Sequence, residues 1–340
     1  MHLGLAGLPG AGKTTLFTAL AGRRVAAGKG REETGQALLN VPDGRLDKLS
    51  AIYRPKKTVY AQITFLDPPA PPGKAEDPAA KIPQEIKYCD GLVEVVRNFD
   101  AGLGPPRPKD DHQALAEEMI LSDLVTLENR LDRLAKERQR GRPQDQEEVS
   151  LLERAKEQLS TEKPLRLIPE VASHVKLKGF GLLSAKPLIV VSNNQDDDPK
   201  PCQVNGQEPP LVIRAALESE LADLEPEERA EFMAEWGLKQ SALDRLIQAA
   251  YRALNLVSFF TVGDDEVRAW TITQGILAPQ AAGVIHSDME KGFIRAEVFQ
   301  FGELLAHGSE ANLKKAGLLK VVGKDYPVAD GDIFHVRFNV

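Results

Sequence analysis

Cysteine is scarce in this sequence: the 340 residues include only Cys89 and Cys202, which lie far apart in the chain. Two distant cysteines argue against a disulfide framework and against a four-cysteine zinc site, and they fit a reducing compartment. Long apolar runs are also missing, since no stretch reaches the roughly 18 apolar residues that indicate a membrane-spanning helix. The first expected strand begins at His2, which leaves no room for a signal peptide. We therefore expect a cytoplasmic protein without a membrane span.

Positive charge is not in excess either. The chain has 43 Lys and Arg residues against 50 Asp and Glu residues, which gives a formal net charge of -7 at pH 7. This balance excludes a protein that wraps nucleic acid with its whole surface, although a local basic face remains possible. We expect no readout of a DNA sequence. The length is sufficient for two or three domains with a large core.

A glycine-rich motif near the N-terminus is the strongest functional signal. Residues 7–14 read GLPGAGKT and match G-x-x-x-x-G-K-[ST], with an expected strand before them and an expected helix after them. In such a loop, glycines turn backbone N–H groups toward phosphate oxygens, and the helix N-terminus adds partial positive charge. Lys13 would reach the β- and γ-phosphates, and the Thr14 hydroxyl would bind Mg²⁺. The predicted nucleotide contacts in this loop are Pro9, Gly10, Ala11, Gly12, Lys13, Thr14 and Thr15.

A second phosphate-site signal is an apolar strand that ends in an acid. Residues 63–67 read ITFLD and end in Asp67. In P-loop proteins an aspartate at this place holds Mg²⁺. The alternative is that Asp67 only opens a turn before the prolines that follow it.

A third signal, the pattern N-x-x-D, follows another buried strand. Residues 187–193 read PLIVVSN, and Asn193 and Asp196 form the pattern. In G domains the asparagine orients the base loop, and the carboxylate accepts hydrogen bonds from the edge of the base. A polar turn after a strand is the plain alternative. The next strand ends near Ala215 and Ala216, and the backbone N–H groups of these two residues would face the base.

Strands and helices alternate along the chain in the manner of a parallel, doubly wound α/β sheet with its ligand at the carboxyl ends of the strands. The expected strands are residues 2–6, 63–67, 91–97, 187–193 and 211–215.

A helical insert interrupts this alternation. Apolar residues at heptad spacing form a seam that comprises Ile120, Leu124, Leu127, Leu131 and Leu134. The sequence Gly141-Arg142-Pro143 ends the first helix, and a second helix turns apolar residues back toward it. These are Val149, Leu152, Ala155 and Leu159. We predict an antiparallel helical hairpin whose charged residues form either a solvated face or a partner-binding arm.

The chain beyond Leu256 changes character. Strand-like runs such as Leu256–Val262 and Ile294–Phe299 alternate with turns, which indicates a separate mixed α/β module. We predict three parts, with the first one discontinuous. They are a P-loop domain of residues 1–108 and 184–256, a helical insert of residues 109–183, and a C-terminal module of residues 257–340.

Long segments of the sequence resemble the YchF/Obg-like ATPases of the translation-factor class of GTPases. The C-terminal segments FFTVGDDEVRAWTITQGILAPQAAGVIHSDMEKGFIRAEV and GKDYPVADGDIFHVRFNV resemble that family's TGS domain. Two earlier segments, VPDGRLDKLSAIYRPKKTVYAQITFLD and LESELADLEPEERAEFMAEWGL, resemble its middle part. The resemblance covers essentially the whole chain. It implies a P-loop NTPase domain with a coiled-coil insert and a C-terminal TGS domain of ubiquitin-like β-grasp fold.

Departures from the family pattern cluster at the nucleotide. Gly10-Ala11 replaces the family's Asn-Val without breaking the loop motif. The first switch segment is shortened, and Thr34 is its candidate Mg²⁺ threonine. The second switch reads DPPA at residues 67–70, and its prolines stiffen it. Pro71 stands where G proteins carry a glutamine, so catalysis would rely on Lys13, Mg²⁺ and backbone N–H groups.

The choice of base stays open between ATP and GTP. The family carries N-x-x-E and prefers ATP, whereas Asp196 stands here as in guanine-specific proteins, and Asn194 replaces the lysine that usually covers the guanine ring. The resemblance favours ATP. Two classes of function remain: a slow Mg²⁺-dependent ATPase or GTPase that acts with the ribosome or another RNA-linked partner, and a degenerate relative that serves as a binding module through its coiled coil and TGS domain.

The C-terminal module is predicted to recognise the partner, a structured RNA in a ribosome-like setting, because it keeps the family pattern most completely and carries a group of basic residues. These are Arg268, Lys291, Arg295, Lys314, Lys315, Lys320, Lys324 and Arg337. The alternative is that they are solvated charges balanced by acidic neighbours.

Overall fold

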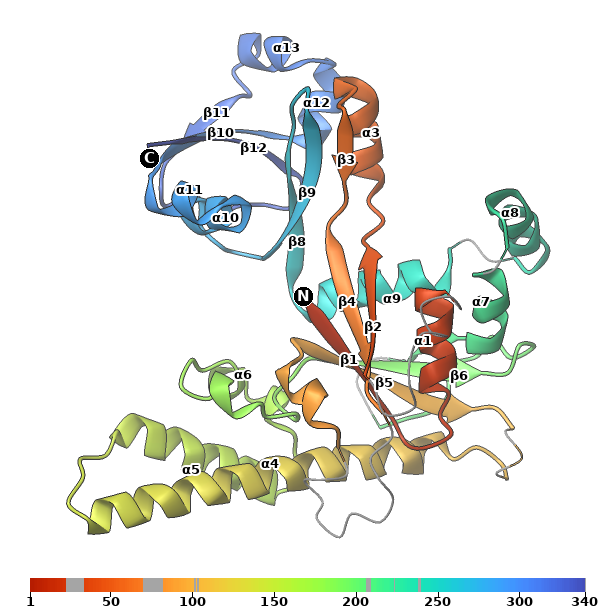
Figure 1. Ribbon diagram of the computed structural model, residues 1–340, viewed down its shortest axis with the longest axis vertical. Coiled ribbons are helices and arrows are strands. Elements are labelled where there is room, and N and C mark those ends of the chain that lie inside the picture. Colours follow the sequence, from red (N-terminus) through yellow and green to blue (C-terminus); the bar gives the residue numbers. More distant parts are fainter. Residues whose placement is uncertain are drawn as a thin grey trace. The chain divides into compact units, whose positions relative to one another are not determined.

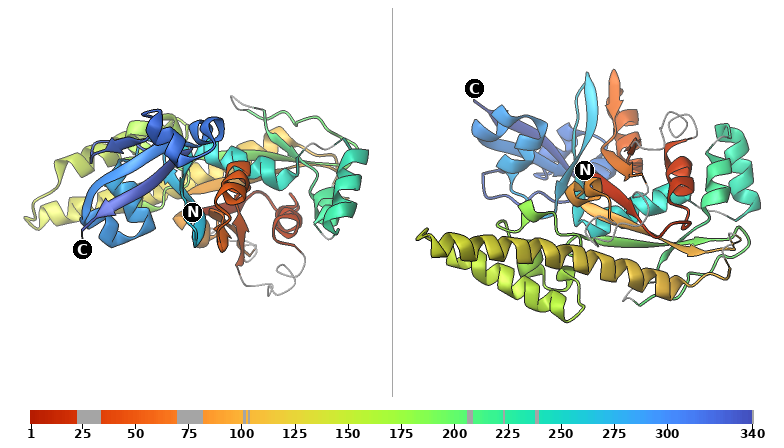
Figure 2. Two further views of the ribbon diagram at one scale, coloured as in Figure 1. Left: turned by 90° about the horizontal axis from the view of Figure 1, so that it is seen from above. Right: turned by 60° about the horizontal axis from the view of Figure 1, so that its bottom comes forward.

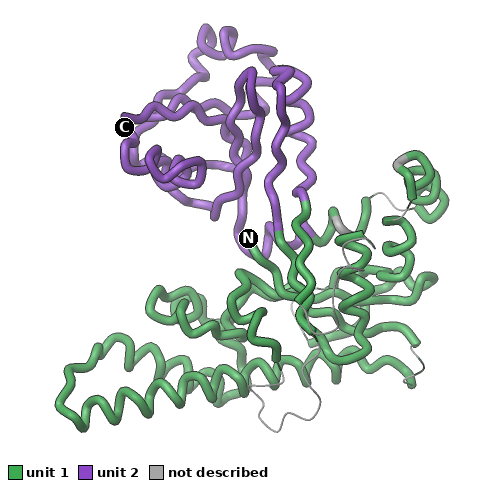
Figure 3. The backbone as a smooth tube through the Cα atoms, viewed as in Figure 1, with its two compact units in different colours: residues 1–39, 64–246 green, residues 40–63, 247–340 purple. Residues whose placement is uncertain are grey.

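The structure is a computed structural model that describes residues 1–22, 34–69, 82–100, 102, 104–205, 209–222, 224–237 and 240–339 (Figure 1). The chain divides into two compact units, which Figure 3 colours separately. The first unit comprises residues 1–39 and 64–246, and the second comprises residues 40–63 and 247–340. Among the described helices, none is long and apolar enough to cross a lipid bilayer.

The first unit is built on a six-stranded sheet with the strand order β2-β4-β1-β5-β6-β7. The strands are β1 His2–Ala6, β2 Gly35–Asn40, β4 Gln62–Asp67, β5 Gly91–Asn98, β6 Leu188–Asn194 and β7 Leu211–Ile213. β1 pairs in parallel with β4 and β5, and the pairs β5–β6 and β6–β7 are parallel too. The predicted parallel sheet is confirmed, and β2 at its edge is a strand that the sequence did not predict.

Helices cover both faces of this sheet, as in a doubly wound fold (Figures 1 and 2). α1, Lys13–Ala21, and α7, Ala215–Leu221, pack against each other on one side, and α4, Pro108–Gln139, runs along the other. The helices α8, Pro226–Glu235, and α9, Ala242–Ala253, follow α7 in the chain. The apolar cluster beneath α4 includes Ala6, Leu66, Leu92, Leu115 and Met119. Because the strands are parallel, the carboxyl ends of β1, β4 and β6 lie at one edge of the sheet.

The predicted hairpin is formed by α4 and by α5, Gln146–Ser160. Pro108 suits the first turn of α4, and the Asp145 carboxylate caps α5 by accepting hydrogen bonds from the Glu147 and Glu148 backbone N–H groups. The apolar residues expected on the two facing helices pack together in one cluster, which confirms the seam. Between the helices and the return to β6 lie a 3₁₀ turn, Leu165–Leu167, and the short α6, Pro169–Ala172.

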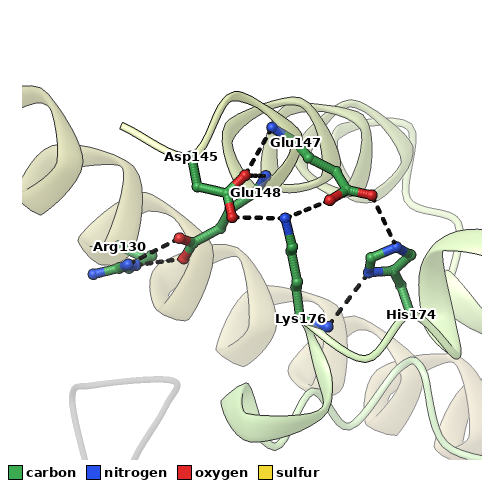
Figure 4. Close-up of polar contacts among 6 residues, drawn as sticks. All are labelled: Arg130, Asp145, Glu147, Glu148, His174 and Lys176. Atoms are coloured by element: carbon green, nitrogen blue, oxygen red, sulfur yellow. Dashed lines mark hydrogen bonds and ion pairs between the residues drawn. The ribbon is translucent and has the colours of Figure 1, made fainter. Parts of the chain in front are cut away.

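Ion pairs join the hairpin helices to each other and to the segment after α6 (Figure 4). Arg130 of α4 donates two parallel hydrogen bonds to the Glu148 carboxylate, at 2.8 and 3.0 Å. The Lys176 ammonium contacts the carboxylates of Asp145 and Glu147 at the start of α5, the first at 2.6 Å. Ion pairs that water can reach are screened and contribute little to stability. They set the geometry of the hairpin more than its stability.

A buried carboxylate anchors the hairpin to the sheet unit. Asp123 of α4 is 1% exposed, and it accepts hydrogen bonds from the backbone N–H groups of Leu183 and Ser184 at 2.8 and 2.7 Å. Burial raises the pKa of Asp123, and these hydrogen bonds oppose that shift. The segment that leads into β6 is therefore fixed to α4 by its own backbone.

The second unit contains a six-stranded sheet in the order β11-β10-β12-β8-β9-β3, and it confirms the predicted β-grasp module. The strands are β3 Lys57–Val59, β8 Leu256–Thr261, β9 Glu266–Thr273, β10 Phe293–Gln300, β11 Lys320–Val322 and β12 Asp332–Phe338. The helices of the module are α10 Ala278–Ile285, α11 Ser287–Lys291, α12 Phe301–His307 and α13 Glu310–Lys315. α10 packs on the sheet through alanines that share a core with Phe259 and Phe334.

Residues 40–63 belong to this second unit, although the sequence assigned them to the P-loop domain. β3 pairs in parallel with β9, and α3, Gly44–Tyr53, precedes it. Arg45 of α3 donates a hydrogen bond to the Asp330 carboxylate at 2.6 Å. A segment far away in sequence thus completes the edge of the C-terminal sheet, an arrangement that local sequence pattern cannot reveal.

Candidate functional site

The loop between β1 and α1 has a backbone path that two glycines make possible. Gly7 has a φ of 142°, and a Cβ atom there would lie 2.5 Å from the Val95 carbonyl oxygen of β5. Gly12 has a φ of 92° at the N-cap of α1, and a Cβ atom there would collide with the Asn193 amide nitrogen. Only glycine fits both positions. The loop is therefore wrapped closely against β5 and β6.

Lys13 is the first residue of α1, and its ammonium group folds back over the loop. The Nζ atom donates hydrogen bonds to the carbonyl oxygens of Gly7 at 2.7 Å and Leu8 at 3.1 Å. These two bonds use two of the three N–H donors of an ammonium group. Burial lowers the pKa of Lys13, and the nearby Asp67 carboxylate opposes that shift. A partly desolvated cation at a helix N-terminus is a strong site for a phosphate oxygen.

Thr14 and Asp67 meet beside this cation. The Thr14 hydroxyl donates a hydrogen bond to the Asp67 carboxylate at 3.2 Å, and Asp67, the last residue of β4, is 1% exposed. A hydroxyl and a carboxylate are hard oxygen ligands that fit Mg²⁺, an ion usually held by one or two protein groups together with substrate phosphates. Among the described residues, no cluster of three or more His, Cys, Asp or Glu side chains could hold a metal ion.

Asn193 joins the phosphate loop to the start of α7. Its side-chain amide donates a hydrogen bond to the Ala11 carbonyl oxygen at 3.0 Å, and its side-chain oxygen accepts one from the Ala215 N–H at 3.1 Å. Asn193, Ala11 and Ala215 are all buried, at 4%, 3% and 1% exposure. One amide group thus fixes the loop, the end of β6 and the first turn of α7 relative to one another.

The side chain of Asn194 is turned into the loop that follows β6. Its side chain accepts a hydrogen bond from the Ser192 hydroxyl at 2.5 Å, and it donates to the carbonyl oxygens of Asp198 at 2.9 Å and Lys200 at 2.5 Å. It is 4% exposed. Asn194 therefore organises residues 195–200 and does not cover a base in place of the family's lysine.

Asp196 lies in this loop, and its backbone is tied to a residue that the sequence analysis missed. Arg214, just before α7, donates a hydrogen bond to the Asp196 carbonyl oxygen at 2.9 Å, and its guanidinium lies 5.8 Å from the centre of the Trp236 ring. The sequence signal that could have identified Arg214 is its position directly before Ala215-Ala216, the two residues predicted to face the base. Ala216 is exposed in the first turn of α7, whereas Ala215 is buried.

The structure brings most of the predicted site residues to one edge of the sheet and leaves some untested. Pro9 and Gly10 of the loop between β1 and α1, and Thr15 in the first turn of α1, are exposed. Thr34 lies directly before β2. Ala70 and Pro71, like residues 28–33 of the first switch segment, lie outside the described residues.

Comparison with known proteins supplies the family. A family model named YchF-GTPase_C, described as "Protein of unknown function (DUF933)", matches residues 256–339. The ribosome-binding ATPase YchF of Bacillus subtilis is 37% identical over 99% of both chains. The Obg-like ATPase 1 of Oryza sativa is 33% identical over all of this chain and 92% of its own. The solved structure of the Schizosaccharomyces pombe YchF GTPase matches with a TM-score of 0.78 and 28% identity, over 99% of this chain and 97% of that one. The chain therefore belongs to the YchF/Obg-like ATPase family of P-loop proteins.

Proposed function

We propose that this protein binds ATP with Mg²⁺ and hydrolyses it slowly while it acts with the ribosome in the cytoplasm. The observation that carries the proposal is the intact phosphate loop, in which Lys13 lies at the helix N-terminus beside the Thr14–Asp67 pair. The relatives supply the choice of nucleotide and partner, since those in bacteria are ribosome-binding ATPases. GTP remains the alternative nucleotide because Asp196 occupies the place of the base-reading acid.

In this proposal each part of the loop has one task. Backbone N–H groups from Pro9 to Thr15, proline excepted, surround the phosphates, and Lys13 binds the β- and γ-phosphate oxygens. Thr14 and Asp67 would hold Mg²⁺, which neutralises charge on those oxygens when it is bound. Lys13 stabilises the charge that develops during transfer, because its desolvated ammonium is already in position. Turnover stays slow because Pro71 can neither orient nor deprotonate water.

Recognition of the base falls to Asn193, Asp196 and the N–H groups of Ala215 and Ala216. Changing Asp196→Glu moves the carboxylate by one methylene, so the ratio of ATP to GTP affinity should change by tenfold to a hundredfold, or about 1–3 kcal/mol. Calorimetry with both nucleotides measures the ratio. The matched control is Asp197→Glu, the same change at the exposed neighbouring residue. An unchanged ratio in Asp196→Glu would reduce the N-x-x-D stretch to a turn.

Binding to the ribosome is proposed to use the C-terminal sheet. Arg295 of β10 and Arg337 of β12 are exposed and lie directly opposite each other, so both side chains point to the same face. The Arg337 guanidinium lies 3.8 Å from the Glu297 carboxylate, and an RNA phosphate would replace that carboxylate as its partner. In this proposal residues 257–340, completed by residues 40–63, form the TGS domain, residues 109–183 form the arm, and the rest of residues 1–108 and 184–256 forms the nucleotide domain.

Replacing Arg295 and Arg337 together by alanine should weaken ribosome binding. It should also reduce the slope of log affinity against log salt concentration by about two, one for each lost phosphate contact. Co-sedimentation of the full chain with ribosomal subunits across a salt series measures both effects. The full chain is needed because β3 and α3 contribute to this sheet unit. Lys48→Ala on the exposed surface of α3 is the control. If the double variant binds like the control, the partner surface lies elsewhere.

A second candidate function is a binding module without hydrolysis. The orientation of Asn194 and the proline-rich second switch favour it, because both depart from the family's nucleotide machinery. Calorimetry with ATP, GTP and their non-hydrolysable analogues, combined with phosphate release, separates the two functions. Binding with slow phosphate release supports the ATPase, and binding without release supports the module. If neither nucleotide binds, the nucleotide proposal fails.

A further inference from the structure

A buried carboxylate and a histidine form a pair that the proposed phosphate chemistry does not use. Glu94 projects from β5 and is 2% exposed, and His112 lies near the start of α4. The Nδ1 atom of His112 lies 2.8 Å from the Glu94 carboxylate. On the opposite side of the ring, the Nε2 atom lies 3.1 Å from the backbone carbonyl oxygen of Asn205. The ring therefore connects three parts of the chain: the central strand, the root of the hairpin, and the loop after β6.

We propose that His112 is a positioning residue for base recognition, which holds the loop of residues 195–205 against the sheet through its bond to Asn205. The proposal rests on the proposed nucleotide-binding function. His112 lies outside the proposed nucleotide contacts and contributes to the discrimination between bases through the loop.

The loop that contains the base-reading Asp196 is held by several elements. Arg214, just before α7, donates a hydrogen bond to the Asp196 carbonyl oxygen at 2.9 Å, and the Asn98 amide at the end of β5 donates one to the Asp198 carboxylate at 3.4 Å. Asn194 binds the carbonyl oxygens of Asp198 and Lys200, and the Ser192 hydroxyl accepts a hydrogen bond from the Cys202 N–H at 3.1 Å. Both of these anchors come from β6 itself. His112 adds an anchor from α4 at the far end of the loop. The placement of the loop thus depends on the start of α4 as well as on β5, β6 and Arg214.

The protonation state of the His112–Glu94 pair determines whether the hydrogen bond to Asn205 forms. A carboxylate and a carbonyl oxygen both accept, so a ring between them must donate from both nitrogens, as an imidazolium does. A neutral ring beside a protonated Glu94 satisfies the same contacts, because the carboxylic acid then donates to Nδ1. Either arrangement holds one proton more than a neutral ring beside a carboxylate. If that proton leaves, the remaining N–H serves the buried carboxylate, and Nε2 loses its bond to Asn205.

The surrounding groups favour retention of this proton. The Glu94 hydrogen bond raises the pKa of His112, and burial raises the pKa of Glu94. Arg166, from the 3₁₀ turn at residues 165–167, opposes the His112 shift, and Asp111 of α4 and Cys202 of the loop also face the Glu94 carboxyl. Because the pKa of His112 is raised on folding, the anchor is fully formed below the ordinary histidine pKa of about 6.5. It is lost as the pH rises through the raised value.

The first test measures the anchor without any nucleotide. Hydrogen exchange of the amides of residues 195–205 should become about fivefold faster in His112→Ala at pH 7, which corresponds to the loss of one net hydrogen bond. Glu94→Gln with His112→Ala, which leaves no carboxylate buried, should show the same change. Unchanged exchange in both variants would overturn the proposal, even if the protein binds no nucleotide. Faster exchange without any nucleotide binding would instead place the failure in the proposed function.

The second test uses the ratio of ATP to GTP affinity between pH 6.0 and pH 8.5, in which any effect of Lys13 on the common phosphates cancels. The ratio should drift with pH in the wild type. In His112→Ala the ratio of ATP to GTP affinity should differ from the low-pH value of the wild type, and it should not change with pH. Glu94→Gln should keep the low-pH ratio at every pH, because the introduced amide donates to Nδ1 and leaves the Nε2–H bonded to Asn205. A wild-type ratio of ATP to GTP affinity in His112→Ala would overturn the proposal. A purely structural role of His112 predicts no pH-independent ratio in Glu94→Gln, so this variant separates positioning from structure.

Discussion

Replacing Lys13 by alanine is expected to lower the affinity for ATP about a hundredfold, whereas the protein should stay folded. The ammonium group lies at the N-terminus of α1 and is held over the loop by the carbonyl oxygens of Gly7 and Leu8. Hydrogen bonds to charged groups are worth about 1.5–3 kcal/mol, and partial burial strengthens the attraction to phosphate. Solvent reaches the loop mouth, so water can take over the two carbonyl oxygens when the side chain is removed.

A second variant, Lys13→Met, separates the charge from the packing of the side chain. Its stem resembles that of lysine, so an equal loss of affinity would assign the effect to the ammonium. Lys48→Ala, on the exposed surface of α3, controls for a general change in charge. Calorimetry and thermal unfolding measure affinity and stability on the same samples. Wild-type affinity in both Lys13 variants would contradict the assignment of the phosphate site.

The affinity of the wild type should also fall at alkaline pH. Burial lowers the pKa of Lys13 in the free protein, and a bound phosphate would raise it again. Binding is therefore strongest where the free protein is already protonated, and it weakens as the pH rises through the lowered pKa. Lys13→Met should lack this decline.

The features that could be predicted from the sequence are those determined by residues that lie close together in the chain. The phosphate loop needs glycine at positions 7 and 12, and both stand within one motif. The heptad seam of the hairpin follows from spacing along two helices, and the strands of the central sheet follow from apolar runs between turns. Each of these signals is complete within a short stretch of sequence, the longest being the hairpin seam between Ile120 and Leu159, so no knowledge of distant contacts was required.

The features that the sequence did not predict depend on partners far apart in the chain. β3 completes the C-terminal sheet by pairing with β9, which lies about two hundred residues later. Arg214 contacts the backbone of Asp196, and His112 contacts that of Asn205. Asn194 was read from its place in the N-x-x-D pattern, yet its hydrogen bonds turn it inward. Side-chain orientation is decided by packing, which a linear pattern does not contain.

Asn193 tests how strongly the phosphate loop depends on such a distant contact. Its amide bridges the Ala11 carbonyl oxygen and the Ala215 N–H, and both backbone groups belong to buried residues. Asn193→Ala leaves the two groups without this partner, so we expect the free energy of unfolding to fall by about 3 kcal/mol. Nucleotide affinity should fall as well, because the loop and the first turn of α7 lose their common support.

Asn193→Asp provides the matched variant, because it has the same shape and can still accept the hydrogen bond from Ala215. Its second oxygen would face the Ala11 carbonyl oxygen, where an ionised carboxylate is repelled and a protonated one can donate. The pKa of the introduced acid should therefore be raised on folding. Its stabilising bond is present at low pH and is lost as the pH rises through the raised value. Asn193→Asp should thus regain stability on acidification relative to Asn193→Ala.

Denaturant unfolding of both variants between pH 5 and pH 8 measures the difference, with Gln274→Ala as a control for an exposed amide side chain at the end of β9. Acidification should narrow the gap between Asn193→Asp and the wild type and leave that between Asn193→Ala and the wild type unchanged. Parallel pH curves for the two variants would mean that the bond to Ala11 carries little of the stability. In that case the loop would be held mainly by the close packing of Gly7 against β5 and of Gly12 against β6. The bridge through Asn193 would then matter for nucleotide affinity alone.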